Sequence, residues 1–262
     1  MLYDLILNNP CALHKLPPSL LIPKICNIVF ITFKLGGCMD RNTAEKILEI
    51  LREHFKDSSW LPSRRGPFET LIITIISQNT SDRNTAKAFN KLSKTFPITP
   101  KDLADAEIAK IEECLKVAGL YRNKAKVIKE VSRIILEKFG GNLQTILAMP
   151  LEESRKTLME LPGVGPKTAD VVLLFSGDKP TIPVDTHVKR VSKRLGLAPM
   201  EGDYEDVRKA LQELYAADDY ADIHVLLILL GRRYCKARNQ LCHECPVNTL
   251  CPSAKFNGKK RK

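Results

Sequence analysis

Apolar residues recur along most of the chain at the three- and four-residue spacing of an amphipathic helix. Between residues 41 and 55, for example, this spacing places Ile47, Leu51 and Phe55 on one face. Polar residues fill the other faces, and glycines follow two of the later segments as stop signals. After the first helix, the pattern predicts further helices over residues 82–96, 102–116, 123–139, 152–159, 166–176, 186–195, 203–215 and 218–230.

One segment departs from this pattern. Residues 67–77 (PFETLIITIIS) are rich in β-branched side chains, which favour a buried strand. The neighbouring segments are all predicted helices, the sequence offers no partner strand, and Pro67 suits the first turn of a helix. We therefore expect a core helix here and an all-α protein with short loops.

The first 38 residues differ in composition from the rest, with few charges, no arginine and four prolines. They show no helical period, and their apolar run at 25–33 is shorter than the ~18 residues that span a membrane. Amphipathic helical composition begins at Met39, and Gly36-Gly37 can be encoded by a ribosome-binding sequence. We therefore predict that Met39 is the natural start, and we expect no membrane association.

The chain is basic, with 41 Lys and Arg against 30 Asp and Glu. Excess positive charge attracts polyanions, of which nucleic acid is the usual one, although a solvated basic surface accounts for the same excess. The tail at 255–262 continues this charge and would add weak phosphate contacts.

Four of the eight cysteines lie within seventeen residues. Their spacing is Cys235-x6-Cys242-x2-Cys245-x5-Cys251. Such a group holds zinc or an iron–sulfur cluster in a reducing compartment, and its chemistry alone leaves both open. Two disulfides are the weaker alternative. Nearby cations suit a loop pressed against a phosphate backbone, or singly a solvated face, and they are Arg232, Arg233, Lys236 and Arg238.

The segment LPGVGPK at 161–167 joins two predicted helices by a tight glycine turn. Glycine permits positive φ, and Pro166 suits a first helical position. The amides of Gly163 and Gly165 would then face outward at a helix N-terminus, which binds anions without reading base sequence. A plain corner between two helices is the equal alternative.

Two side chains near this turn suit covalent chemistry. Lys167 is either a surface partner of Asp170 or, as a neutral amine, a nucleophile. Asp185 is predicted to cap the helix that begins at Thr186. A capping carboxylate is held ionised and fixed, which suits a negative charge beside a developing cation better than a strong base.

The segments LPGVGPKTADVV and PVDTH resemble the helix-hairpin-helix and the catalytic aspartate segment of the endonuclease III family of DNA glycosylases. The cysteine spacing resembles the [4Fe-4S] loop of the same family, and the resemblance spans residues 41–252. It implies that Lys167 and Asp185 are catalytic and that the cluster is structural and positions DNA. The implied reaction is attack of the amine on C1′ of a flipped-out nucleotide, followed by a Schiff base and β-elimination.

The resemblance implies two further DNA contacts. SQNT at 77–80 resembles the segment whose glutamine fills the gap left by the extruded base, which gives Gln78. GLYRNK at 119–124 resembles the loop whose leucine wedges beside the orphaned base, which gives Leu120. Without the resemblance, Gln78 reads as a helix end and Leu120 as a core residue.

The implied fold is two helical domains flanking a DNA-binding cleft. We expect an iron–sulfur domain at 39–62 and 180–254, a six-helix domain with the hairpin at 63–179, and extra segments at 1–38 and 255–262. The expected partner is double-stranded DNA with damaged or mismatched bases or abasic sites. We also expect a monomer in the cytoplasm, associated with the nucleoid.

These observations predict a base-excision-repair enzyme, a DNA glycosylase with abasic-site lyase activity that acts on oxidised pyrimidines. A glycosylase that removes thymine or uracil opposite guanine is the alternative enzyme. A non-catalytic iron–sulfur protein that binds DNA is the alternative from another class. No motif names the damaged base.

Overall fold

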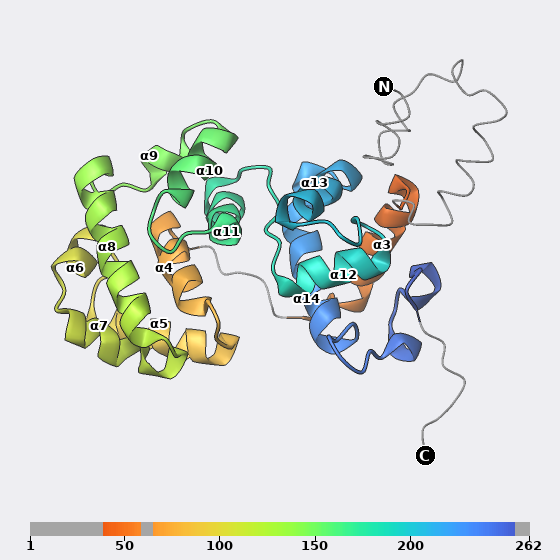
Figure 1. Cartoon of the computed structure of the whole chain (residues 1–262), viewed down its shortest axis with the longest axis horizontal. Helices are drawn as coiled ribbons and strands as arrows, with labels where there is room; N and C mark the ends of the chain where they lie inside the picture. The colour runs from red at the N-terminus through yellow and green to blue at the C-terminus, as the bar shows by residue number, and fades with distance from the viewer. Residues whose placement is uncertain (1–38, 59–64, 255–262) are drawn as a thin grey trace. The chain divides into compact units, whose positions relative to one another are not determined.

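The computed structural model describes residues 39–58 and 65–254, which form α-helices and short 3₁₀ turns (Figure 1). No strand occurs in this part of the chain, so the prediction of an all-α protein is confirmed. None of its helices is long and apolar enough to cross a membrane. The predictions for residues 1–38 and 255–262 concern residues outside the described part.

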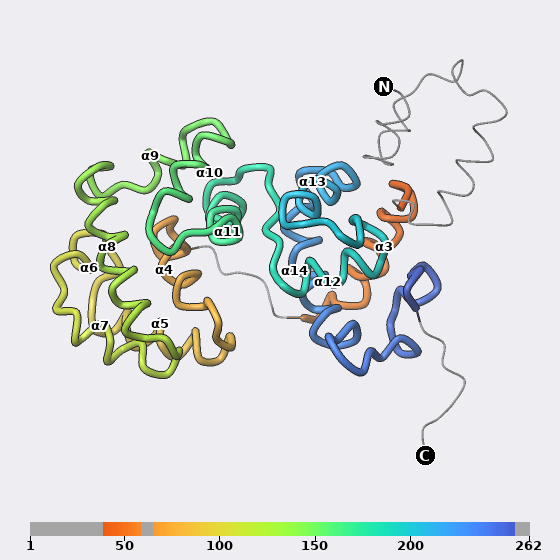
Figure 2. Tube along the Cα trace, in the orientation of Figure 1, coloured from red at the N-terminus to blue at the C-terminus, as the bar shows by residue number. Residues whose placement is uncertain are grey.

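The described residues divide into two compact units. We call residues 65–183 the hairpin unit, and residues 39–58 with 184–254 the cysteine unit (Figure 2). The hairpin unit contains α4 (Pro67–Ser77), α5 (Asp82–Thr95), α6 (Pro100–Asp105), α7 (Ile108–Leu115), α8 (Tyr121–Phe139), α9 (Gln144–Leu147), α10 (Leu151–Met159) and α11 (Pro166–Gly177). The cysteine unit contains α3 (Arg41–His54), α12 (Thr186–Leu195), α13 (Tyr204–Leu214) and α14 (Tyr220–Arg233).

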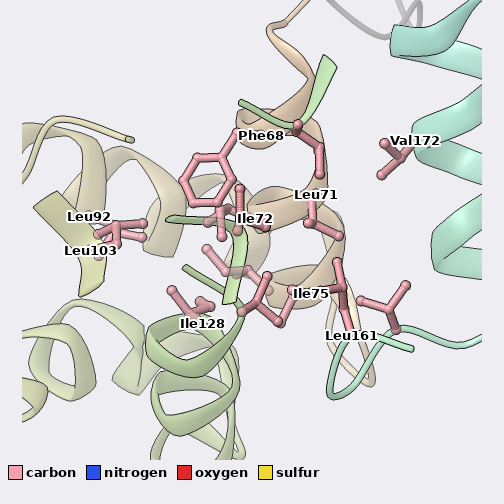
Figure 3. Packing of buried hydrophobic residues seen from close by; sticks show 14 of the residues in the cluster. Phe68, Leu71, Ile72, Ile75, Leu92, Leu103, Ile128, Leu161 and Val172 are labelled. Atoms are coloured by element: carbon pink, nitrogen blue, oxygen red, sulfur yellow. The ribbon is translucent and has the colours of Figure 1, made fainter. Parts of the chain in front are cut away.

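Helix α4 lies in the core of the hairpin unit, as expected for residues 67–77. Pro67 stands at its first position, and most of its apolar side chains are buried. Figure 3 shows Phe68, Leu71, Ile72 and Ile75 of α4 packed among apolar side chains from the surrounding helices. Burying such a side chain stabilises the fold by about 1.5–3 kcal/mol. This gain outweighs the low helix propensity of β-branched residues, which explains why a strand-like composition folds as a helix.

The single helix predicted over 102–116 is wrong. Helix α6 ends at Asp105 and α7 begins at Ile108, because Ala106 is buried in an extended conformation (φ −57°, ψ 142°). The break frees the carbonyls of Ala104 and Ala106 from helical hydrogen bonds. The Lys129 Nζ on α8 donates to both carbonyls, at 2.6 Å and 2.6 Å.

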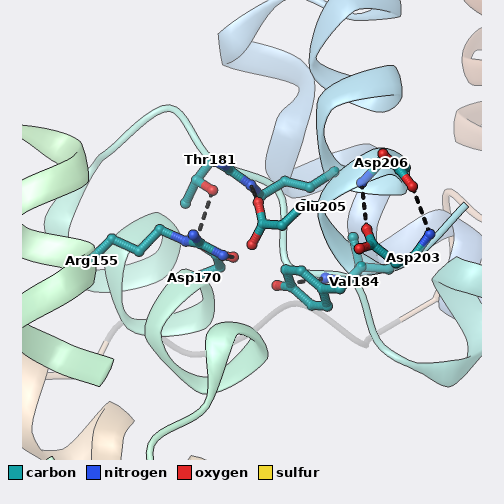
Figure 4. Close-up of polar contacts among 9 residues, drawn as sticks. Arg155, Asp170, Thr181, Val184, Asp203, Glu205 and Asp206 are labelled. Atoms are coloured by element: carbon teal, nitrogen blue, oxygen red, sulfur yellow. Dashed lines mark hydrogen bonds and ion pairs between the residues drawn. The ribbon is translucent and has the colours of Figure 1, made fainter. Parts of the chain in front are cut away.

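In the cysteine unit, α12 and α14 pack closely. Gly231 on α14 faces α12, where an added Cβ would lie 3.0 Å from His187 Nδ1. Arg190 on α12 donates to the carbonyls of Gly231 (3.1 Å) and Cys235 (3.0 Å). These bonds tie α12 to the end of α14, where the cysteine segment begins. A capping box between Asp203 and Asp206 starts α13 (Figure 4).

Candidate nucleic-acid interface and catalytic residues

The glycine turn before α11 places its two glycines under different constraints. Gly163 has φ +72°, and an added Cβ would lie 2.7 Å from Val127 Cγ1 on α8, so both its conformation and its packing require glycine. Gly165 caps α11 with φ −91° and ψ 179°, which any residue adopts. An added Cβ there would meet nothing within 4 Å. Nothing within the described chain requires glycine at 165, so positive φ explains only Gly163.

Lys167 is the second residue of α11 and is half-buried. Asp170, one turn later, is fully buried. The Asp170 carboxylate accepts from Arg155 Nε (2.9 Å), Arg155 Nη2 (3.2 Å) and Thr181 Oγ1 (2.9 Å) (Figure 4). These bonds fix α10, α11 and the segment that leaves α11, and so hold the two helices of the hairpin.

The structure brings Gln78 to the hairpin. Gln78 follows α4, and its Nε2 donates to the Gly163 carbonyl at 3.0 Å and to Thr168 Oγ1 at 3.3 Å. Two segments that are 85 residues apart in sequence therefore meet through one amide. Sequence reasoning did not predict this contact.

Leu120 is exposed, with 61% of its surface accessible, so its interpretation as a core residue is wrong. It precedes α8 in the left-handed region (φ 48°), directly after Gly119 at φ 65°. A non-glycine residue in this region costs free energy and is typical of functional sites. The structure therefore presents an apolar side chain to solvent on a constrained backbone.

Asp185 lies in the cysteine unit and is half-buried. Its Oδ1 accepts from the Val188 amide at 2.7 Å, so the predicted N-cap of α12 is confirmed. The bond fixes the carboxylate in one orientation.

The four clustered cysteines line one apolar pocket. Leu195, Leu230 and Tyr234 complete much of its wall. Burial raises the pKa of the Cys245 thiol to about 11 and also raises that of Cys251. All cysteines in the described part of the chain are free thiols, which contradicts the two-disulfide alternative.

Four thiols that line one pocket are a donor set that suits an iron–sulfur cluster, and zinc as well. Nowhere in residues 39–58 and 65–254 do three His, Cys, Asp or Glu side chains converge closely enough for one metal ion. Metal binding would also release the protons that burial favours on these thiols.

Arginines of α12 hold the cysteine segment, and sequence reasoning missed them. Arg194 donates to the Lys236 carbonyl at 2.7 Å and lies 3.6 Å from Cys235 Sγ. Its own carbonyl accepts from Cys251 Sγ at 3.4 Å. Arg190 and Arg194 lie one helical turn apart. This spacing is the feature of the sequence that could have indicated a shared role.

The predicted basic contacts in this segment are all exposed. Arg232 and Arg233 end α14, and Arg233 lies with its Cζ 5.3 Å from the Tyr234 ring centroid. Lys236 and Arg238 follow in the loop between the first two cysteines. Exposed cations at these positions suit contact with phosphates.

Comparison with known proteins gives consistent matches. The family model described as HhH-GPD superfamily base excision DNA repair protein matches residues 72–217. Endonuclease III of Thermotoga maritima is 39% identical over 213 residues, which cover 81% of this chain and 95% of that protein. Endonuclease III of Escherichia coli K12 is 35% identical over 215 residues, covering 81% and 96%. A solved structure of a trapped endonuclease III–DNA covalent intermediate superposes with a TM-score of 0.72 and 32% identity, covering 82% of this chain and 97% of that one.

Proposed function

Because this chain belongs to the endonuclease III family of the HhH-GPD superfamily and is a DNA repair glycosylase, we propose that it excises oxidised pyrimidines from double-stranded DNA and then cleaves the abasic site. The observation that carries the lyase step is Lys167, an amine at the N-terminus of α11 directly behind the glycine hairpin. A glycosylase that only hydrolyses the base has no need of an amine there.

In this proposal the hairpin binds the DNA backbone. The N-terminus of α11 carries partial positive charge and unpaired amides, which attract a phosphate. The open space beside Gly165 allows a backbone phosphate to approach the main chain closely. These contacts read no base, so they position any duplex in the same way.

Lys167 then acts as the nucleophile. Its neutral amine attacks C1′, the glycosidic bond breaks, and the base departs with the bonding electron pair. The lysine nitrogen loses one proton, and the C1′–O4′ bond of the sugar ring breaks as the protonated imine forms and O4′ takes up a proton. Loss of a C2′ proton then breaks the C3′–O bond and expels the 3′ phosphate, and water hydrolyses the imine to release the lysine.

We assign Asp185 the role of a fixed negative charge. The sugar gains positive charge as the base leaves, and a carboxylate held by the Val188 amide stabilises that charge without reorganising. This role suits a capping carboxylate, whose single orientation is set before the substrate binds.

We propose that Cys235, Cys242, Cys245 and Cys251 hold a [4Fe-4S] cluster. The cluster would cross-link the segment that presents Lys236 and Arg238, which would otherwise depend on the bonds from Arg190 and Arg194. Iron and sulfide analysis of the purified protein tests this assignment. We expect Cys245→Ser to lose iron, and zinc in place of iron in the native protein would contradict the proposal.

Borohydride trapping tests the lyase mechanism, because borohydride reduces the imine to a stable covalent adduct. We expect the wild-type protein to trap on abasic duplex DNA and Lys167→Ala to trap none. Lys156→Ala, which removes an exposed lysine of α10, is the matched control and should trap normally. Absence of an adduct with the wild-type protein on any abasic DNA would overturn the lyase.

Asp185→Asn separates charge from capping, since asparagine also caps a helix. We expect its melting temperature to stay close to wild type while excision slows by about 10²–10³-fold, the usual cost of losing one fixed electrostatic contact. Equal rates for the variant and the wild type would remove Asp185 from the mechanism.

A panel of duplexes identifies the base. We expect cleavage of DNA that contains thymine glycol or dihydrouracil, and little cleavage with 8-oxoguanine. Processing of only G·T and G·U pairs would replace the proposal with a mismatch glycosylase.

A further inference from the structure

Lys124 is a buried lysine that the proposed reaction does not use. It lies in the first turn of α8 and is 3% exposed. Its Nζ donates to the Ile76 carbonyl at 2.8 Å and to the Ala118 carbonyl at 3.0 Å. It has no carboxylate partner among the described residues, and burial lowers the pKa of its ammonium group. Burying an unpaired charge is costly, so a methionine of similar length would pack here with less penalty.

The two carbonyls lie directly before the two loops that carry the predicted DNA contacts, Ile76 near the end of α4 and Ala118 at the end of a short 3₁₀ turn. The Ile76 carbonyl lies two residues before Gln78, and the Ala118 carbonyl lies two residues before Leu120. Both loops are conformationally constrained, because Asn79 (φ 54°) and Leu120 (φ 48°) occupy the left-handed region. Such conformations persist only where surrounding contacts hold them.

We propose that Lys124 is a positioning residue that joins these two loops and fixes the distance between the gap-filling Gln78 and the wedging Leu120. An extruded nucleotide leaves one gap in the duplex, and both side chains have to reach it together. A single ammonium bonded to the chain just before each loop keeps the two loops in register while DNA is bent and opened. The inference rests on the proposed function, since it requires that these loops enter DNA.

The same helix supplies a matched control. Lys129, further along α8, also donates to two backbone carbonyls, that of Ala104 in α6 and that of Ala106 in the loop after α6. Its loop is the break between α6 and α7, which carries none of the predicted DNA contacts. Lys124→Met and Lys129→Met therefore remove the same kind of bond, but only the first is adjacent to the predicted wedge.

The test uses the full-length, iron-loaded protein and duplex DNA containing thymine glycol, with 2-aminopurine beside the lesion to report base extrusion. We expect Lys124→Met to slow single-turnover excision and the fluorescence rise by roughly 10–100-fold, the usual cost of a small misplacement of reacting groups. The dissociation constant for DNA should change little, because the hairpin is untouched. Cleavage of a preformed abasic site should fall less, since no base has to leave the stack. Lys129→Met should match the wild type in every rate.

Equal extrusion and excision rates in Lys124→Met and Lys129→Met would overturn the inference while leaving the proposed function intact. If the wild-type protein excised no base and cleaved no abasic site, both would fall. Lys124→Gln covers the case in which Lys124→Met does not fold, because its amide still donates to one carbonyl. We expect Lys124→Gln to extrude the base at a rate between those of Lys124→Met and the wild type. A wild-type extrusion rate in folded Lys124→Gln would also contradict the positioning role.

Discussion

The ion pair between Arg155 and Asp170 permits a stability prediction that can be worked from the structure. Both side chains are buried, the contact is bidentate at 2.9 Å and 3.2 Å, and Thr181 adds a third bond to the carboxylate. Arg155→Met keeps an apolar stem of similar length but removes both guanidinium bonds from the buried Asp170 carboxylate. Removing one partner of a buried pair destabilises a protein by about 3–5 kcal/mol. For a domain in this size range, each kcal/mol lowers the melting temperature by about 2–4 °C, so we expect a loss of roughly 6–20 °C.

The matched control is Arg133→Met on α8. Arg133 pairs with Glu130 and Glu137, but its side chain is 50% exposed. Exposed pairs contribute about 0–1 kcal/mol, so this variant should stay close to wild type. Differential scanning calorimetry and denaturant titration followed by circular dichroism measure both variants.

A double variant tests the physical reason. Replacing both partners, as in Arg155→Met with Asp170→Leu, removes the buried charge, so most of the lost free energy of unfolding should return. The reasoning is refuted if Arg155→Met loses no more than Arg133→Met, or if the double variant is less stable than Arg155→Met.

Three further outcomes follow from single residues. Gly163→Ala should lower the free energy of unfolding by about 1–3 kcal/mol, because it adds an alanine in the left-handed region against Val127. Gly165→Ala should unfold like wild type but bind DNA more weakly in a fluorescence anisotropy titration. Equal losses of stability in the two variants would contradict this contrast. Tyr215→Phe should leave the free energy of unfolding unchanged or raise it by about 1 kcal/mol in denaturant unfolding, because the buried Tyr215 hydroxyl has no hydrogen-bond partner among the described residues. A decrease of more than about 1 kcal/mol would contradict this reasoning. Burial lowers the pKa of Lys124 below its ordinary 10.5, so the unfolded chain binds this proton more readily and stability should rise as pH increases between the two values. Denaturant unfolding at a series of pH values measures this rise, which should be smaller in Lys124→Met. The same dependence of stability on pH in the variant and the wild type would show that Lys124 is not its cause.

Helix α4 shows what sequence reasoning captures well. Its composition favoured a strand, but Pro67 and the helical context identified a helix whose bounds the structure reproduces. The N-cap at Asp185 was accessible for the same reason, since capping depends on residues three positions apart. Local rules are sufficient where the deciding contact lies within one turn of chain.

The failures have the opposite cause. The break between α6 and α7 depends on Lys129, whose two bonds reach back 25 and 23 residues in sequence. Lys124 reaches back 48 residues to Ile76, and Arg190 reaches forward 45 residues to Cys235. From periodicity alone, such lysines and arginines are predicted to be solvated charges. The neighbouring sequence does not indicate that their side chains donate to backbone carbonyls far away in the chain.

Leu120 illustrates a third case. Its periodicity suggested burial, whereas its exposure follows from the left-handed backbone of the preceding turn. Only the resemblance of its segment to a known family suggested the wedge, and a single leucine in an apolar pattern carries no signal of its own.

The hydrogen bond from Gln78 to the Gly163 carbonyl adds a free-energy cost to any insertion of the Gln78 side chain into DNA. In the free protein this amide is already bonded, so it has to be released before it can enter a duplex. Release costs about 1 kcal/mol, the net value of one such bond, which corresponds to several-fold in population. Intact, well-stacked DNA offers the amide no compensating partners, whereas a site that has lost a base offers the pairing edge of the orphaned partner. If Gln78 fills the gap beside an orphaned base, as its segment's resemblance implies, the free protein would keep this amide bonded to Gly163 on intact DNA and release it only where a base has been lost.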